Sequence, residues 1–492
     1  MSGYPDTSVL RGSYECFAHR FAAAVFTVII VGYLGLIGVG QWQGDEFADF
    51  ALETRGWPAL FHRLTWSPRP LSESLFAFYG WLTLRLERPL IPVFLGLLWT
   101  GFLLAGFARS RTDPRTENRK YESRAAGLTG LALIAAFLTA NYLTEVFYWP
   151  AGAVAYLPSL SASLYLFLQV ARGALESPEG RLRCSIALFI AAFTSETGAF
   201  LVTSYATVLI VAAARSRIRR RSSSQNGRSL GWVFWPGVAG ALVLLTAGLI
   251  RFRLGRFNSS ELYGTKDHPA ASIAAALSNL VANIFGPGQQ KHGWILFNVE
   301  FLSVILLALG IGLSWNRVRR SPARHRDDLI CLASVFLLAA FLTLFASHIH
   351  LGTTVGERHQ VMVRCWVRLA VASAAIVVLG SSRFQRLRER PLLQASAPIF
   401  LICSVVLLWQ VKPLWHQYRG YRAIYLTIQD NFRSGFEPGN ETIEWVLPPN
   451  RGVMTFAAIN PGKYSRAEAS AYPRYILDYF NKPVIIVRGY AK

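Results

Sequence analysis

The chain has 492 residues, of which 52% are hydrophobic and only 16% are charged, and its formal net charge is +22. A soluble domain carries nearer a quarter of charged residues, so the composition excludes an ordinary soluble protein and indicates an integral membrane protein. The net charge alone would suggest nucleic-acid binding. The Lys and Arg residues gather in alternate loops instead, which disfavours a nucleic-acid partner.

The apolar residues come in blocks without the two-residue alternation of strands, which predicts spanning helices rather than a barrel. A helix needs about 20 mostly apolar residues to cross a bilayer, and on this basis we expect about eleven spans. The predicted spans, with two short helices inside the longest block, are Phe21–Gly40, Leu90–Ala108, Ala125–Ala140, Ala153–Val170, Cys184–Ala214, Trp232–Ile250, Trp294–Leu313, Leu329–Ser347, Cys365–Gly380 and Ala397–Val411.

Two segments need a separate interpretation. Cys184–Ala214 is long for one span and short for two, and basic residues flank both of its ends. Its polar triplet Ser195–Thr197 predicts a turn between two short helices at the outer face. Ala270–Phe285, in the outer loop 251–293, is expected to be an interfacial helix. Aromatic residues of the first outer loop, 41–89, are expected to anchor it to membrane lipids.

Basic residues alternate between the two sides of this predicted topology. Because Lys and Arg prefer cytoplasmic loops, the N-terminus is predicted in the cytoplasm and the tail outside. We therefore expect a transmembrane domain at residues 1–411 and a small extracytoplasmic α/β domain at 412–492. In that domain a helix over Ala471–Asn481 is expected between strands at Arg451–Ile459 and Pro483–Gly489. The basic segments are residues 1–20, 109–124, 172–183, 215–228, 317–326 and 383–390.

The most informative polar feature is a group of acids directly after the first span. Asp45 and Glu46 are adjacent, and Asp49 and Glu53 follow at helical spacing. Clustered carboxylates repel one another, which raises at least one pKa and favours a bound cation or a general base. An ordinary solvated start of a loop is the alternative interpretation.

The position of this acidic pair resembles the signature of GT-C superfamily glycosyltransferases, and later segments resemble their bacterial GtrII-like branch. Ser67–Pro70, with Arg69, stands where that branch has a Gly-Arg element, although the Gly is missing here. Glu145–Gly152 followed by Tyr156 is similar to its aromatic-Trp-x-x-Gly…Tyr segment. The remaining elements of the resemblance are Glu196, Arg358 and the short extracytoplasmic tail.

The resemblance implies transfer of a sugar from a polyprenyl-phosphate donor to a glycan, lipid or protein acceptor, outside a bacterial cytoplasmic membrane. It makes Asp45 the likelier base and Glu46 the second, whereas spacing alone leaves both open. Arg side chains suit the departing phosphate. Aromatic rings suit stacking on sugar faces. The residues expected to bind substrate are Arg69, Glu145, Tyr148, Trp149, Tyr156, Glu196, His350 and Arg358.

Metal binding is less well supported by the sequence. His348 and His350 have no third ligand nearby, so phosphate contact or a simple interface position competes with a metal site. No cysteine spacing predicts a metal or a disulfide framework. A divalent cation, Mg or Mn, remains an open expectation at the acidic group.

Two other functions are also carried out by polytopic proteins of this membrane. A flippase or transporter of lipid-linked glycans would need charged residues within many spans. A Wzy-like polymerase would rely more on Arg-rich outer loops than on an acidic pair after the first span. The acidic pair therefore favours the glycosyltransferase.

Overall fold

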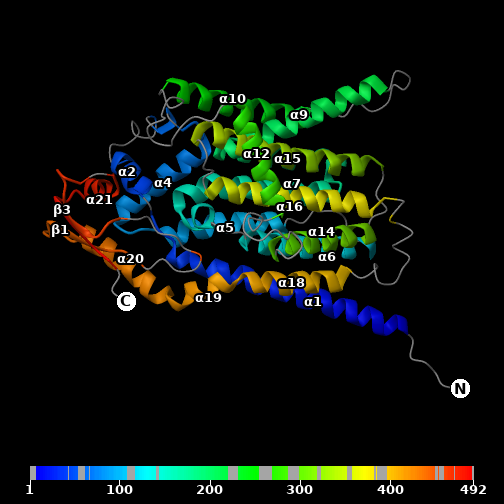
Figure 1. Ribbon diagram of the computed structural model, residues 1–492, viewed down its shortest axis with the longest axis horizontal. Helices are drawn as coiled ribbons and strands as arrows, with labels where there is room; N and C mark the ends of the chain where they lie inside the picture. The colour runs from blue at the N-terminus through cyan, green and yellow to red at the C-terminus, as the bar shows by residue number, and fades with distance from the viewer. Residues whose placement is uncertain are drawn as a thin grey trace.

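The structure is a computed structural model in which long helices run side by side, with a small sheet at one end (Figure 1). The beginning of α1 lies at the right of the figure, and the strands lie at the left. The described residues are 7–42, 44–53, 61, 63–65, 67–107, 117–139, 143–219, 231–253, 269–285, 299–318, 323–351, 357–381, 384, 396–448, 453, 459–469 and 471–489.

Within this part of the chain, seven helices are long and apolar enough to cross a membrane. An eighth candidate is a pair bent by 41°, made of α18 (Ser396–Gln410) and α19 (Lys412–Arg419). The chain is therefore a polytopic α-helical membrane protein, as predicted. The seven helices are α1 (Thr7–Leu34) continued by η1 (Gly35–Val39), α7 (Pro150–Ala171), α9 (Glu196–Arg219), α10 (Gly231–Arg253), α14 (Val299–Val318), α15 (Ala323–Leu351) and α16 (Glu357–Leu379).

Shorter helices complete the bundle. Helices α5 (Ile91–Phe107), α6 (Glu117–Leu138) and α8 (Pro178–Thr194) cover three further predicted spans, so the count of about eleven stays a prediction. Helix α12 (Pro269–Phe285) matches the predicted helix in the loop 251–293 and packs against α15 and α16. The first loop contains α2 (Gly44–Glu53) and α4 (Pro70–Leu86).

The predicted break in the block Cys184–Ala214 is present, because α8 ends at Thr194 and α9 begins at Glu196. Ser195 between them is extended, with φ −161° and ψ 156°. Its hydroxyl accepts the N–H of Gly198 at 3.0 Å and lies 2.9 Å from the hydroxyl of Ser159 on α7. Ser195 thus caps the start of α9, because its hydroxyl accepts one of the backbone N–H groups that lack a partner within the helix.

Segments predicted to share one side of the membrane meet at one end of the bundle, which we call the α2 end. It carries α2 and the beginnings of α4, α7, α9 and α16, joined by contacts described below. At the opposite end, His19 of α1 lies 3.2 Å from the Ser396 hydroxyl of α18. The helix starts that were predicted on the outer side therefore lie together at one end of the bundle.

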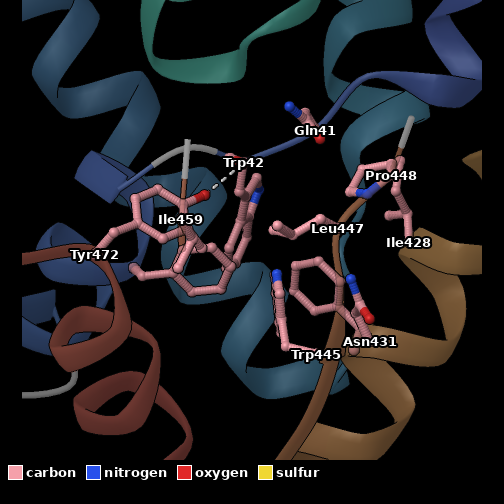
Figure 2. A pocket seen from close by; sticks show the side chains of 11 residues that line it. Gln41, Trp42, Ile428, Asn431, Trp445, Leu447, Pro448, Ile459 and Tyr472 are labelled. Carbon is pink, nitrogen blue, oxygen red and sulfur yellow. Dashed lines mark hydrogen bonds between the residues drawn. The ribbon is translucent and has the colours of Figure 1, made fainter. Parts of the chain in front are cut away.

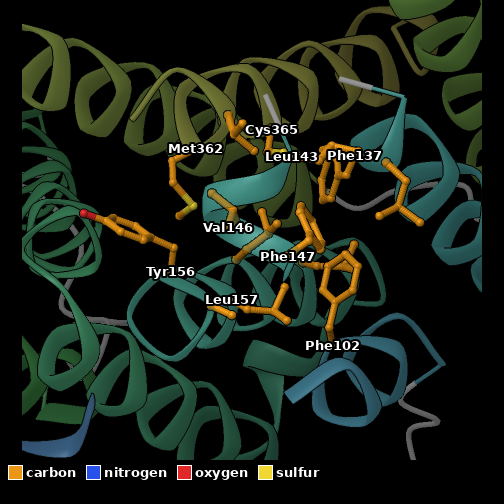
Figure 3. Packing of buried hydrophobic residues seen from close by; sticks show 14 of the residues in the cluster. Phe102, Phe137, Leu143, Val146, Phe147, Tyr156, Leu157, Met362 and Cys365 are labelled. Carbon is orange, nitrogen blue, oxygen red and sulfur yellow. The ribbon is translucent and has the colours of Figure 1, made fainter. Parts of the chain in front are cut away.

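The core between these ends is closely packed and largely apolar (Figure 3). Phe147 contacts Trp99 and Phe102, with ring centroids 5.3 and 5.6 Å apart. Phe147 belongs to η2 (Thr144–Tyr148), a single π-helical turn that leads into α7. Tyr148 is the last residue of this turn, and Tyr156 of the predicted sugar-binding segment follows on α7.

The C-terminal segment is a small α/β unit of α20 (Tyr421–Phe436), α21 (Ala471–Phe480) and three strands. Strand β3 (Val484–Arg488) lies in the centre, parallel to β1 (Thr442–Val446) and antiparallel to β2 (Gly462–Ser465). Helix α21 and strand β3 match the predicted helix and second strand. The predicted strand Arg451–Ile459 lies almost wholly outside the described residues, and β1 and β2 were not predicted.

This unit packs directly on the first loop. Helix α21 packs on α2, and Phe47 of α2 lies among rings of the C-terminal unit. Its ring centroid is 5.5 Å from that of Trp445 and 6.0 Å from that of Tyr472. The C-terminal unit therefore forms one wall around the helix that carries the acidic pair.

Candidate active site at the α2 end

Glu46 is fully buried and caps a helix. The backbone N–H of Ala151 donates to its Oε1 with an N···O distance of 3.1 Å. Ala151 is the second residue of α7, where N–H groups lack partners within the helix and the dipole favours a negative charge. This contact joins the acidic helix α2 to the start of the predicted sugar-binding segment. The side chain of its neighbour Asp45 lies outside the described part of the structure.

The next acid, Asp49, belongs to a buried ion-pair group that the sequence did not predict. Arg63 lies between two carboxylates. Its Nη1 is 2.9 Å from Oδ2 of Asp49, and its Nε is 2.9 Å from Oε2 of Glu73. Ser67 donates to the other oxygen of Glu73 at 2.7 Å, and the Arg63 guanidinium lies 4.6 Å from the centre of the Phe76 ring. Burial of an unpaired charge is costly, so this group stabilises the first loop as a unit. Asp49 therefore has a structural role, as a partner in this ion-pair group, rather than a catalytic one.

Arg69 and Glu196, both predicted as substrate-binding residues, form an ion pair with 2.6 Å between Nε and Oε2. Arg69 directly precedes α4, and Glu196 begins α9. Burial alone would lower the pKa of Arg69, but the nearby Glu196, Tyr156 and Glu73 outweigh it and hold the pKa above its usual value. The Arg69 side chain is therefore charged over the whole physiological range.

The glycine of the Trp-x-x-Gly segment is required by a close backbone approach. A Cβ atom on Gly152 would lie 1.8 Å from the carbonyl oxygen of Glu145. The Trp149 N–H donates to the Thr144 carbonyl at 2.9 Å, and Pro150 occupies the first turn of α7. The segment thus folds into a tight π-turn followed at once by a helix, which fixes the direction of the Trp149 ring.

Arg358 lies between two of the predicted aromatic residues. Its guanidinium carbon is 5.9 Å from the ring centres of both Trp149 and Tyr156, within the range of cation–π attraction. Its backbone N–H donates to Oε2 of Glu145 at 3.3 Å. We call Glu145, Trp149, Tyr156 and Arg358 the Arg358 cradle. The Trp149 Nε1–H is buried and, among the residues that the structure describes, has no hydrogen-bond partner.

Two predicted residues do not join the cradle. Tyr148 is fully buried on the other side of η2, where its hydroxyl donates to the carbonyl of Tyr33 at 2.8 Å. Tyr156, in contrast, points away from Phe102 and Phe147 (Figure 3). Tyr148 is therefore placed for packing against α1 and not for stacking on a sugar. The side chain of His350 lies outside the described part of the structure.

Two further polar contacts lie inside the bundle, one at Arg368, which was not singled out from the sequence, and one at His348, which was considered there as a phosphate or metal contact. Arg368 of α16 is buried and lies 3.3 Å from Glu300 of α14. His348 of α15 lies 2.7 Å from the side chain of Asn279 on α12. Charged residues inside predicted spans are costly and usually functional, and this signal would have identified Arg368.

A small pocket at the α2 end belongs to the C-terminal unit (Figure 2). It measures about 30 Å³, room for one or two waters rather than a sugar. The Tyr472 hydroxyl closes one side by donating to the Trp42 carbonyl at 3.1 Å. The lining contains none of the cradle residues. Its residues are Gln41, Trp42, Phe47, Ile428, Asn431, Phe432, Trp445, Leu447, Pro448, Ile459 and Tyr472.

Within the described ranges, no group of three or more His, Cys, Asp or Glu side chains is arranged to hold a metal ion. Glu46 and Asp49 are engaged by Ala151 and Arg63. The expected divalent cation therefore stays a prediction that depends on Asp45.

Comparison of the chain with protein-family models, with curated proteins and with solved structures gives no match. The fold by itself defines the class: a polytopic α-helical membrane protein with a polar, partly buried end. Any narrower assignment depends on the residues gathered at the α2 end.

Proposed function

We propose that the chain is an inverting glycosyltransferase of the GT-C type, using a polyprenyl-phosphate-linked sugar. One observation carries the proposal: the acidic helix α2, the Arg69–Glu196 pair and the Arg358 cradle meet at one end of the bundle. Their residues come from four segments far apart in the sequence. Convergence of a candidate base, partly buried cations and aromatic rings is what a lipid-linked sugar substrate requires.

In the proposed reaction, Asp45 accepts the proton of an acceptor hydroxyl while that oxygen attacks the anomeric carbon of the donor. The bond from the anomeric carbon to the phosphate oxygen breaks, and its electron pair leaves with the polyprenyl phosphate. Arg358 stabilises the negative charge of that phosphate. Attack opposite the leaving group inverts the anomeric configuration. Glu46, held by the N–H of Ala151, keeps α2 in place beside α7.

The proposal also includes the arrangement of the chain in the membrane. We place the α2 end and the C-terminal unit on the outer face of a bacterial cytoplasmic membrane, with about eleven spans between the cytoplasmic N-terminus and the tail. The support is the basic character of the loops assigned to the opposite end. Nucleotide sugars are absent from the compartment outside this membrane, so a transferase that acts there needs a lipid-linked donor.

The test compares Asp45→Asn with Glu46→Gln in the purified full chain. The substrates are a panel of radiolabelled polyprenyl-phosphate hexoses and pentoses with cell-envelope acceptors, and the readout is labelled product. Loss of the base should lower the rate about 10²–10⁴-fold. The Gln amide oxygen of Glu46→Gln still accepts from Ala151, so that variant should be milder.

Both variants should unfold at nearly the temperature of the wild type, which separates chemistry from folding. Full activity of Asp45→Asn would remove Asp45 as the base. Full activity of the double variant would remove the acidic pair from the mechanism altogether.

A flippase of lipid-linked glycans is the second candidate, and the buried Arg368–Glu300 pair favours it. A flippase would move a fluorescent polyprenyl-phosphate sugar across a liposome membrane without forming a glycosidic bond. The flippase would be favoured over the transferase if Asp45→Asn translocates the lipid at the wild-type rate and neither it nor the wild type forms labelled glycan.

A further inference from the structure

The exposed face of α18 is aliphatic along its length. Ile402, Val405 and Leu408 are exposed at spacings of three residues, and Trp409 follows with 79% of its surface exposed. An exposed aliphatic face on a spanning candidate faces lipid hydrocarbon, and a Trp at its end is typical of the membrane interface. The end of α18 therefore marks the level at which the hydrocarbon ends.

The same helical face continues beyond Gln410 with a different chemistry. In α19 and α20 the exposed side chains include Trp415, 63% exposed, and Tyr418, followed by Arg419, Arg422 and Tyr425. The Arg419 guanidinium lies 5.4 Å from the Trp415 ring centre. Residues 412–429 contain no Asp or Glu. We call this face, from Trp415 to Tyr425, the basic-aromatic stripe.

Packing on α1 holds the stripe in this orientation. Three side chains of α19 and α20 lie against a row of glycines spaced by three residues: Leu414 at Gly32, Tyr418 at Gly35 and Tyr421 at Gly38. The Tyr418 hydroxyl donates to the Gly32 carbonyl at 2.7 Å and would lie 2.2 Å from a Cβ atom at Gly35. The stripe is therefore fixed outward beside two helices of the bundle, α1 and α18.

We propose that the basic-aromatic stripe lies in the headgroup layer of the membrane and binds anionic phospholipid headgroups. Along one face the surface changes from aliphatic to aromatic to cationic, in the order in which a bilayer changes from hydrocarbon to interface to headgroup. Arg and Lys near a membrane surface attract anionic lipids, and Tyr and Trp rings occupy the boundary. The inference does not depend on the proposed enzymatic function.

The first test measures thermal unfolding of the full chain in nanodiscs of phosphatidylcholine, with and without phosphatidylglycerol. Phosphatidylglycerol should raise the unfolding temperature of the wild type, and added salt should reduce the increase. The double variant Arg419→Gln/Arg422→Gln should lose most of the increase. Lys463→Gln/Arg488→Gln, which removes two exposed cations of the sheet, should keep it.

The second test locates the stripe without relying on stability. An environment-sensitive fluorophore is attached at Trp415→Cys, in a background whose exposed Cys16 is replaced by Ser. Brominated phospholipids should quench it more than iodide in the water phase does. Stronger quenching by iodide would place the stripe in water and overturn the proposal. An unchanged phosphatidylglycerol effect in the stripe variant, or no effect in the wild type, would also overturn it.

Discussion

Arg69 and Glu196 lie 127 residues apart in the sequence and are joined by an ion pair of 2.6 Å. The pair ties the end of the first loop to the break between α8 and α9. The break between α8 and α9 is therefore joined to the first loop. Glu196 is positioned by this break and by its ion pair with Arg69. Its low exposure makes it a sensitive site for substitution.

We expect Glu196→Gln to destabilise the protein by about 1–3 kcal/mol. Breaking a buried pair costs about 3–5 kcal/mol, and the partial exposure of both side chains, 23% and 15%, reduces the effect here. Thermal unfolding in detergent measures it. The control is Glu179→Gln, which breaks the exposed Arg183–Glu179 pair and should cost only a few tenths of a kcal/mol. Equal losses in the two variants would refute the structural role of Glu196.

Substitution of Gly152 by Ala tests the tight approach of η2 to α7. The new Cβ atom would meet the carbonyl oxygen of Glu145, so Gly152→Ala should lower stability by about 1–3 kcal/mol or more. Gly96→Ala on α5 is a matched control, because nothing lies within 4 Å of its Cβ position. That variant should gain up to about 1 kcal/mol from helix propensity. A neutral Gly152→Ala would contradict the described turn.

A double-mutant cycle tests the contact between η1, which continues α1, and α19. Gly35→Ala should destabilise the protein because its Cβ would lie 2.2 Å from the Tyr418 hydroxyl oxygen. Tyr418→Phe removes that oxygen and leaves the ring carbon at 3.4 Å, an ordinary contact. The double variant should therefore be more stable than the sum of the single effects predicts, by about 1 kcal/mol or more. Simple additivity would show that these two residues do not touch.

Trp149→Phe tests whether the buried indole N–H serves a ligand. A buried donor without a partner costs about 1–3 kcal/mol, so its removal should offset much of the lost packing. We expect stability to change little while binding of a polyprenyl-phosphate sugar weakens about tenfold. Isothermal titration in detergent measures the binding. Unchanged binding together with a large loss of stability would make Trp149 a packing residue only.

Stability at acidic pH should depend on Asp478 of α21. Partial burial by itself would raise its pKa, but hydrogen bonds from Arg466 and Arg474 outweigh this and hold the pKa below its usual value. The ion pairs therefore stabilise the fold above about pH 3.9, the unfolded-state pKa. This contribution is lost as the pH falls through the lower folded-state pKa.

The effect should be small because the side chain is 30% exposed. Wild type and Asp478→Asn should accordingly differ in unfolding temperature at pH 7, and the difference should shrink as the pH falls through the lowered folded-state pKa of Asp478. A constant difference between them across this range would show that the ion pairs do not contribute.

Local patterns in the sequence determined much of the fold. Hydropathy identified the spanning helices because every segment in lipid must bury its own backbone groups. The break at Ser195 was readable because Cys184–Ala214 is too long for one span, has basic residues at both ends and contains the polar triplet Ser195–Thr197 in its middle. Basic residues sorted the loops into two groups, which predicts that the loops alternate between the two sides of the membrane.

The tertiary structure alone decided which polar residues act together. Tyr148 and Tyr156 belong to one motif, yet Tyr148, the last residue of η2, packs against α1, and Tyr156, on α7, lies under Arg358. Glu46 became a cap for α7, and Arg63 appeared between two acids, through contacts that no local pattern encodes. Helix formation depends on neighbours within a few residues, whereas ion pairing depends on where distant helices pack. The sequence therefore determines the helices, and the packing of those helices determines the site.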